Sequence, residues 1–317
     1  MARNIIATFV ETKRVMNPKV RTYSMPVCMV VGVLLHNHIS RLDFLSPYLI
    51  ALMLFVTFTR VKASELKLQK IHAGQLAIQL LGGTLLYFLL KWCGVNEIVC
   101  QGVMICVLIP TAMASVVVGG MLGANVTTMT TFTLLSNMSL AVVAPVLFSF
   151  MGANNDLPFL TSFWLILRRL LLLVVLPFVA AQLLDKLSSK GFDYVRNHQS
   201  WSFYLWLSSL TILMSSTTNF ILAQPREYIG LEITMALLAG VVCVAQFALG
   251  RWWGKRCGDK VAGGQSVGQK NTLLAVLLAQ TYLHPLSSVA PTAYIIWQNL
   301  YNSRQLARHA KRNEKAE

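Results

Sequence analysis

The chain is 317 residues long, 55% apolar and 12% charged, and its formal net charge is +15. A soluble domain carries about 25% charged residues, so this composition excludes a soluble enzyme with an ordinary surface. The apolar residues form blocks of roughly the ~20 residues that cross a bilayer as a helix. On a soluble protein the charge would suggest nucleic acid, but on a membrane protein it indicates basic cytoplasmic loops, and no nucleic-acid partner is expected.

Ten apolar segments are predicted to cross a lipid bilayer as helices. In chain order they cover residues 23–39, 46–62, 70–91, 98–122, 125–151, 159–184, 201–222, 229–253, 264–282 and 284–302. Residues 1–22 are basic but lack a compact apolar stretch before a small-residue cleavage site, so we expect a retained cytoplasmic arm and not a cleaved signal peptide. Residues 304–317 form a basic tail.

The distribution of the 27 Lys and Arg residues supports this number of spans. With both termini inside, 21 of the 27 fall on the cytoplasmic side: five in the arm, four, three and four in the second, sixth and eighth loops, and five in the tail. The other side receives Arg41, Lys91 and Arg226, and the remaining three, Arg168, Arg169 and Lys270, lie within predicted spans. Because basic residues collect on the cytoplasmic side, we predict a multi-pass protein of the plasma membrane, the inner membrane if the source is a bacterium.

The ten spans divide into two halves of five, residues 23–155 and 156–303, which meet near Asn154-Asn155-Asp156. An odd number of spans per half inverts the second half relative to the first, an arrangement common among secondary transporters. We therefore predict an all-α integral membrane fold of ten transmembrane helices in two inverted five-helix repeats.

The fourth and ninth spans hold equivalent places in the two halves, and both are interrupted. Pro110 and Gly119-Gly120 interrupt the fourth, and Gly263-Gly264 and the polar run 268–272 interrupt the ninth. Irregular backbone at membrane depth is tolerated only where protein or water lines it. Two broken helices are the favoured interpretation, and simple loops between shorter helices are the alternative.

Lys270 is the cation that the preference for the cytoplasmic side does not explain, because it lies in the interrupted part of the ninth span. A cation at membrane depth costs at least ~2.5–3.5 kcal/mol on insertion scales, so it should face a cavity or a partner. Alternatively, the ninth helix starts later and Lys270 reaches the cytoplasmic interface. Helix N-termini near the midplane favour anions, so a small organic anion is the expected substrate, with Thr111, Ser115, Lys270 and Asn271 as candidate contacts.

Several stretches resemble the bile acid:sodium symporter family. Members carry Pro-Gly-Gly-Thr-Ala-Ser-Asn in the fourth helix, where residues 110–116 read PTAMASV, and Glu-x-Gly-x-Gln-Asn in the ninth, where residues 266–271 read SVGQKN. Residues 47–55 and 297–300 are similar too. The resemblance implies a ten-helix fold with a panel domain and a core domain, in which the broken helices cross. It also implies a transporter of bile acids or small carboxylates, and not an enzyme.

The resemblance implies two sodium sites around that crossing, and the chain matches them only in part. Gln79, Ser115, Thr133 and Asn271 fall on matching polar positions. A site Asn falls on Val116, a site Ser on Met129, the shared Glu on Ser266 and a site Gln on Lys270. The degenerate coupling site therefore comprises Gln79, Ser115, Thr133, Ser266, Gln269 and Lys270.

The departures exchange an anionic oxygen for a fixed cation. Two like charges ~4 Å apart repel by about 4 kcal/mol at an effective dielectric constant of ~20. We therefore expect no sodium, no other metal and no cofactor, and we expect the Lys270 ammonium to replace sodium and hold the crossing together. Proton coupling through Lys270 and uncoupled transport both stay open.

Three other functions compete with sodium-independent transport. A channel usually needs a symmetric ring or repeated filter, whereas this chain has one asymmetric pair of broken helices. A membrane enzyme needs a nucleophile with a base or a set of metal ligands, and at depth only Lys270 is available. A transport-inactive binding or receptor-like protein of the same fold stays open, as do the substrate, the transport direction and the oligomeric state.

Overall fold

The structure is a computed structural model that describes residues 18–59, 67–112, 114–151, 158–198, 200–223 and 225–313. Among these residues the regular elements are all helices. Six of the described helices are long and apolar enough to cross a membrane, namely His36–Phe58, Lys70–Trp92, Val126–Phe150, Phe159–Leu187, Ser200–Leu222 and Arg226–Arg256. The chain is therefore an all-α, multi-pass membrane protein, and the ten spans in inverted repeats stay a prediction.

The chain divides into two compact units, each built from two separate stretches. Unit 1 comprises Met1–Glu65 and Arg168–Gln224, and unit 2 comprises Leu66–Leu167 and Pro225–Glu317. Unit 1 thus contains the first two predicted spans of each half, and unit 2 contains the last three predicted spans of each half. Residues 159–167, at the start of the sixth span, belong to unit 2. Residues 1–17 of the predicted arm, the junction at 154–156 and residues 314–317 of the tail lie outside the described residues.

Unit 1 is organised around α12, which packs against α2 and α4. Thr57 Oγ1 and Ser202 Oγ, 2.9 Å apart, link α4 to α12, and Asn219 Nδ2 on α12 donates to the His36 carbonyl at 3.0 Å. The helices that lie in this unit are α2 (Pro18–Leu34), α3 (His36–Ile39), η2 (Ser40–Leu45), α4 (Ser46–Phe58), η4 (Leu171–Val175), α10 (Leu176–Leu187), α11 (Ser189–Asn197) and α12 (Ser200–Leu222).

Unit 2 contains two runs of the same kind: a long helix, an interrupted helix and another long helix. The first run is α5 (Lys70–Trp92), α6 (Glu97–Leu108), α7 (Ala114–Met121) and α8 (Val126–Phe150). The second is α13 (Ile229–Arg256), α14 (Lys260–Gly268), α15 (Thr272–Tyr282) and α16 (Val289–Asn313), with η5 (Arg226–Tyr228) and η6 (Pro285–Ser288) between helices. α9 (Phe159–Leu170) begins in unit 2 and ends in unit 1.

Both interruptions occur where the sequence places them, between α6 and α7 and between α14 and α15. Several boundaries differ from prediction, and the two differences described here concern α14 and α16. The ninth segment begins at Lys260, four residues before the predicted start at 264, because the Asp259 side chain accepts the Ala262 amide at 2.7 Å and caps α14. The helix α16 continues through Asn313, so residues 304–313 of the predicted tail are helical.

Close glycine contacts join α13 to α14 and position the first half of the broken helix. A Cβ added at Gly263 would lie 2.2 Å from the Gly250 carbonyl oxygen, and one added at Gly250 would lie 2.4 Å from the Gly263 carbonyl oxygen. The turn between the helices contains Gly258 at a φ of 89°, a conformation that side chains rarely adopt. The backbones of α13 and α14 therefore pack directly on each other.

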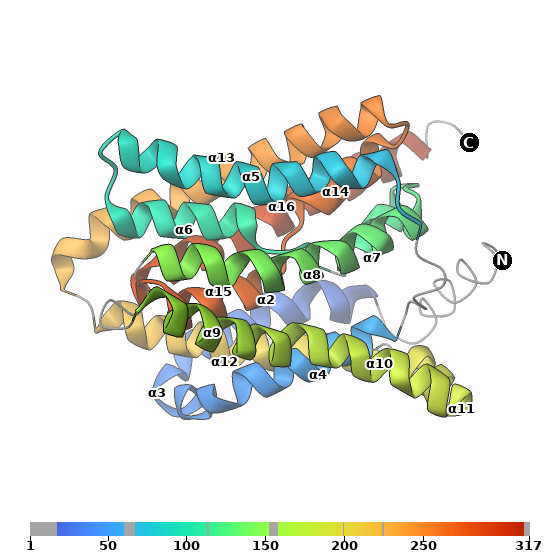
Figure 1. The fold of residues 1–317 in the computed structure, drawn as a ribbon, viewed down its shortest axis with the longest axis horizontal. Coiled ribbons are helices and arrows are strands. Elements are labelled where there is room, and N and C mark those ends of the chain that lie inside the picture. The colour runs from blue at the N-terminus through green and yellow to red at the C-terminus, as the bar shows by residue number, and fades with distance from the viewer. Residues whose placement is uncertain are drawn as a thin grey trace. The chain divides into compact units, whose positions relative to one another are not determined.

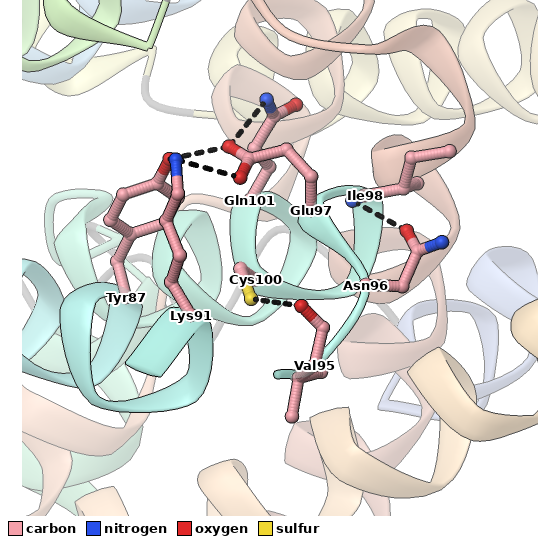
Figure 2. A network of polar contacts seen from close by, with 8 residues as sticks. All are labelled: Tyr87, Lys91, Val95, Asn96, Glu97, Ile98, Cys100 and Gln101. Carbon is pink, nitrogen blue, oxygen red and sulfur yellow. Dashed lines mark hydrogen bonds and ion pairs between the residues drawn. The ribbon is translucent and has the colours of Figure 1, made fainter. Parts of the chain in front are cut away.

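A polar network at the other end of α6 fixes the turn from α5 (Figure 2). Glu97 accepts hydrogen bonds from the Tyr87 hydroxyl and, at 3.3 Å, from Gln101 Nε2. It also forms an ion pair with Lys91 Nζ at 3.1 Å. Asn96 caps α6 by accepting the Ile98 amide at 2.9 Å. Glu97 lies in the first turn of α6, where the helix dipole favours a carboxylate. Figure 1 shows α6 running beside α5 and α13 toward the interruption.

Candidate functional site

The two interrupted segments pair with each other inside unit 2. Thr111 and Lys270 form an antiparallel bridge. The Ala112 amide donates to the Gln269 carbonyl at 3.1 Å, and the Asn271 amide donates to the Pro110 carbonyl at 2.8 Å. We call this pairing the crossing, and the ends of α6, α7, α14 and α15 meet there.

Every carbonyl in the last turn of α6 has a donor. A helix leaves its last four carbonyls without an intrahelical partner, and at membrane depth water does not supply one. Here the donors come from α5, α13, the crossing and the chain that follows the helix. In order from Ile105 to Leu108, the carbonyls accept from the Ile109 amide at 3.1 Å, Gln246 Nε2 at 3.1 Å, Lys270 Nζ at 2.8 Å and Gln79 Nε2 at 2.9 Å.

Lys270 supplies a buried cation to that helix end. Its side chain is 1% exposed, its Nζ donates to the Val107 carbonyl, and its amide donates to Gln298 Oε1 at 2.9 Å. The C-terminal end of a helix carries a partial negative charge, which favours a cation. Among the described residues Lys270 forms no ion pair with a carboxylate. Its burial excludes the alternative in which the side chain reaches the membrane interface.

The end of α14 is capped by side chains from both halves of the chain. Thr111 Oγ1 donates to the Ser266 carbonyl, and the Tyr294 hydroxyl on α16 donates to the Gly268 carbonyl at 2.8 Å. Lys270, from the ninth segment, thus caps α6, while Thr111, from the fourth, caps α14. Each interruption therefore stabilises the helix end of the other.

A polar bridge fixes the crossing to the neighbouring helices α5 and α8. Ser136 Oγ on α8 donates to Gln79 Oε1 on α5 at 2.6 Å and accepts the Thr111 amide at 3.1 Å. All three residues are buried. The Thr111 amide therefore has a partner although its backbone is not helical.

Three of the four residues predicted to contact substrate make bonds that hold the crossing together, and their contact with substrate stays a prediction. The side chains of Thr111 and Lys270 are bonded to helix-end carbonyls, and Asn271 Oδ1 accepts the Leu274 amide at 3.4 Å as the cap of α15. Ser115, in the first turn of α7, is fully buried. Ser115 thus keeps a buried hydroxyl without a partner among the described residues.

Of the predicted coupling positions, Gln79 and Lys270 bond to the end of α6. Thr133 Oγ1 donates to the Met129 carbonyl of its own helix at 2.9 Å. Ser266 Oγ and Gln269 Oε1 are buried and have no partner in the part of the chain that the structure describes. Val116 and Met129, which stand where the resembling family has ligands, are 1% and 0% exposed.

Sequence reasoning missed Gln246, Tyr294 and Gln298 as parts of this site. Each is a polar residue within a largely apolar predicted span, which was the available signal. Their partners include the backbone groups of Cys106, Gly268 and Lys270, and no side-chain pattern marks a backbone group as unpaired.

The comparison with known families bears on the class of the protein. A family model described as the Sodium Bile acid symporter family matches residues 44–224, more than half of the 317-residue chain. A search of curated proteins found no match. The matched range includes the α6–α7 interruption with Pro110, Thr111 and Ser115. The chain therefore belongs to the Sodium Bile acid symporter family, a family of membrane transporters.

Proposed function

We propose that this protein is a secondary active transporter of an organic anion, of the bile acid or small-carboxylate class, that works by alternating access without sodium. Membership of a symporter family supports the transporter class. One contact carries the proposal of sodium independence: the buried Lys270 ammonium donates to the Val107 carbonyl at 2.8 Å.

The groups around the crossing do not fit a sodium ion. Sodium needs several oxygen ligands and benefits from a nearby carboxylate. The carbonyls of Cys106 and Leu108, on either side of Val107, are bonded to glutamine side chains. A sodium ion ~4 Å from the ammonium would be repelled by about 4 kcal/mol at an effective dielectric constant of ~20. The covalently attached cation therefore replaces the mobile one.

A tethered ammonium changes how transport is coupled. Half-helix ends in transporters commonly bind a coupling ion that arrives and leaves. Lys270 cannot leave, so the protein either exchanges a proton at this side chain or transports its substrate down the substrate's own gradient. Uptake driven by an imposed proton gradient separates these two modes.

The polarity of the crossing suits an anionic substrate. The N-termini of α7 and α15 begin directly after the interruptions, and helix N-termini carry partial positive charge. The free Ser115 hydroxyl lies in the first turn of α7 and can donate to a carboxylate. The negative ends of α6 and α14 are neutralised by their caps. The net field at the crossing therefore favours an anion.

Counterflow in proteoliposomes tests the proposed function. Vesicles loaded with unlabelled cholate or benzoate should accumulate the labelled compound from outside, with an initial rate that saturates with concentration. Flux that does not saturate and shows no counterflow would instead indicate a channel. Binding of either compound, measured by thermal shift, without any counterflow would indicate a transport-inactive binding protein.

A further inference from the structure

A second buried polar cluster lies away from the crossing, where α13, α14 and α16 pack together. It consists of Arg251 on α13, Gln265 on α14, and Asn302 and Gln305 on α16, and we call it the amide–arginine cluster. Gln265 and Asn302 are 1% and 5% exposed, and Arg251 and Gln305 are half-buried. Gln265 precedes Lys270 by five residues, so the cluster lies on the half of the broken helix before the crossing.

The four side chains contact one another directly. Gln265 Nε2 donates to Asn302 Oδ1 at 3.1 Å and lies 3.5 Å from Gln305 Oε1. Arg251 Nη2 donates to the same Gln305 oxygen. Three helices therefore bring three amides and one guanidinium to a single place.

Arg251 is held in position without a counter-charge. Its guanidinium carbon lies 5.7 Å from the centre of the Tyr301 ring, and that ring stacks on Phe247 at 4.1 Å. A Cβ added at Gly264 would lie 2.5 Å from Arg251 Cγ, so the glycine leaves room for the arginine stem. Among the described residues Arg251 has no acidic partner. A positioned, unpaired guanidinium is well suited to bind an oxyanion through its fork of N–H donors.

The amides add donors that have no partner. Asn302 Nδ2 and Gln305 Nε2 are buried and unbonded within the described chain, and Gln265 Oε1 is an unbonded acceptor. Leaving a buried polar group unpaired costs about 1–3 kcal/mol, so such a group calls for an explanation. Two amide donors beside a guanidinium suit the two oxygens of a carboxylate, and the remaining acceptor suits a hydroxyl group or water.

We propose that the amide–arginine cluster is a carboxylate-binding subsite that the transported anion occupies before or after the crossing. The inference rests on the proposed function. The cluster has a cation that is free to bind the substrate, which the crossing lacks. The Lys270 side chain is 1% exposed and its ammonium is bonded to the Val107 carbonyl, so it is not accessible to a substrate in this conformation. Arg251 provides the free cation, and Asn302 and Gln305 orient the carboxylate.

Thermal-shift titration of the purified full chain in neutral detergent tests this assignment. The probes are benzoate and its neutral analogue benzamide, and benzoate alone should stabilise the protein. Arg251→Gln should raise the half-saturating benzoate concentration about tenfold or more, since it removes a charge-assisted pair. Arg251→Lys should recover part of the affinity, because it restores the charge but not the fork.

The control is Arg256→Gln, which removes a nearby arginine of the same helix. Arg256 is exposed and lies over the Trp252 ring at 3.9 Å, outside the cluster. Its benzoate titration should match that of the wild type. If Arg251→Gln does not fold, Asn302→Ala provides the second test, because it removes one unbonded donor and should weaken benzoate binding while benzamide stays without effect.

Three results would overturn the subsite. Benzoate and benzamide could stabilise the wild type equally, Arg251→Gln could bind benzoate as tightly as Arg256→Gln, or phosphatidylglycerol could stabilise the protein through Arg251 where benzoate does not. Counterflow separates this failure from failure of the proposed function. If Arg251→Gln exchanges benzoate at the wild-type rate, the subsite is refuted but the transport function is not. If benzoate binding depends on Arg251 but no exchange occurs, the transport function is refuted but the subsite is not.

Discussion

At the scale of single residues, the crossing depends on which side chains pair with its backbone atoms. Lys270 and Thr111 occupy matching places in the two interruptions and cap opposite helix ends. Neither side chain is positioned to act as a free ligand. The crossing is therefore held by the protein's own side chains, and an added ion has no open helix-end carbonyl to bind at Val107.

Replacing Lys270 with Met should impair both stability and uptake. The change leaves the buried Val107 carbonyl without its donor, which should lower the free energy of unfolding by about 1–3 kcal/mol, partly offset because a buried charge is also removed. Thermal unfolding and cholate counterflow measure the two effects. Lys260→Met, at an exposed lysine that begins α14, is the control and should change stability by less than about 0.5 kcal/mol. Wild-type stability and uptake in Lys270→Met would contradict this role.

Ser136→Ala should loosen the crossing from the α8 side. The substitution removes the acceptor of the Thr111 amide and the donor to Gln79 together. An unpaired buried amide costs about 1–3 kcal/mol, so the apparent melting temperature and the maximal counterflow rate should both fall. Ser139→Ala, at a half-buried serine three residues further along α8, should leave both close to the wild type. Equal behaviour of the two variants would show that the bridge contributes nothing.

The sequence predicted some of these residues but not their partners. Lys270, Thr111 and Ser115 stand out because polar residues in an apolar span need a reason. The Val107 carbonyl does not stand out in the sequence, because every residue has a carbonyl. Only the folded helix end shows which carbonyl lacks a partner within the helix. For the same reason the sequence suggested Thr111 and Asn271 as substrate contacts, which stay a prediction, but gave no sign of the capping bonds that the structure shows.

At the scale of elements, breaks were easier to predict than helix boundaries. Pro, Gly and polar residues inside apolar runs located both interruptions. The start of α14 was placed too late, because residues 260–263 read as a charged and glycine-rich loop. The Asp259 cap and close packing on α13 make them helical, and both depend on contacts across a turn.

Gly263→Ala should separate α13 from α14 and thereby displace the first half of the broken helix. The new Cβ would lie 2.2 Å from the Gly250 carbonyl oxygen, which is backbone and cannot rotate away. We expect a loss of about 1–3 kcal/mol in unfolding free energy, typical of overpacking. Gly230→Ala, near the start of α13, has no atom within 4 Å of the new Cβ and should be neutral or stabilising by up to about 1 kcal/mol. Thermal unfolding compares them, and equal melting temperatures would refute the close packing.

At the scale of the whole molecule, composition and charge predicted the class of protein but not its division. The apolar content and the placement of basic residues led to a multi-pass membrane protein, which the six long apolar helices confirm. The two consecutive repeats stay a prediction, and each compact unit combines stretches from both of them. A chain pattern shows which segments are equivalent, but which of them pack together depends on contacts between distant residues.

The measurement that tests the central claim most directly is cholate uptake by proteoliposomes with and without an inward sodium gradient. If the Lys270 ammonium replaces sodium, saturable uptake should be the same in sodium and in choline buffer at equal membrane potential and pH. Imposing a proton gradient in the same vesicles then separates proton-coupled from uncoupled transport. Strong stimulation by sodium that survives Lys270→Ala would contradict the account, because it would show that a working sodium site exists without the lysine.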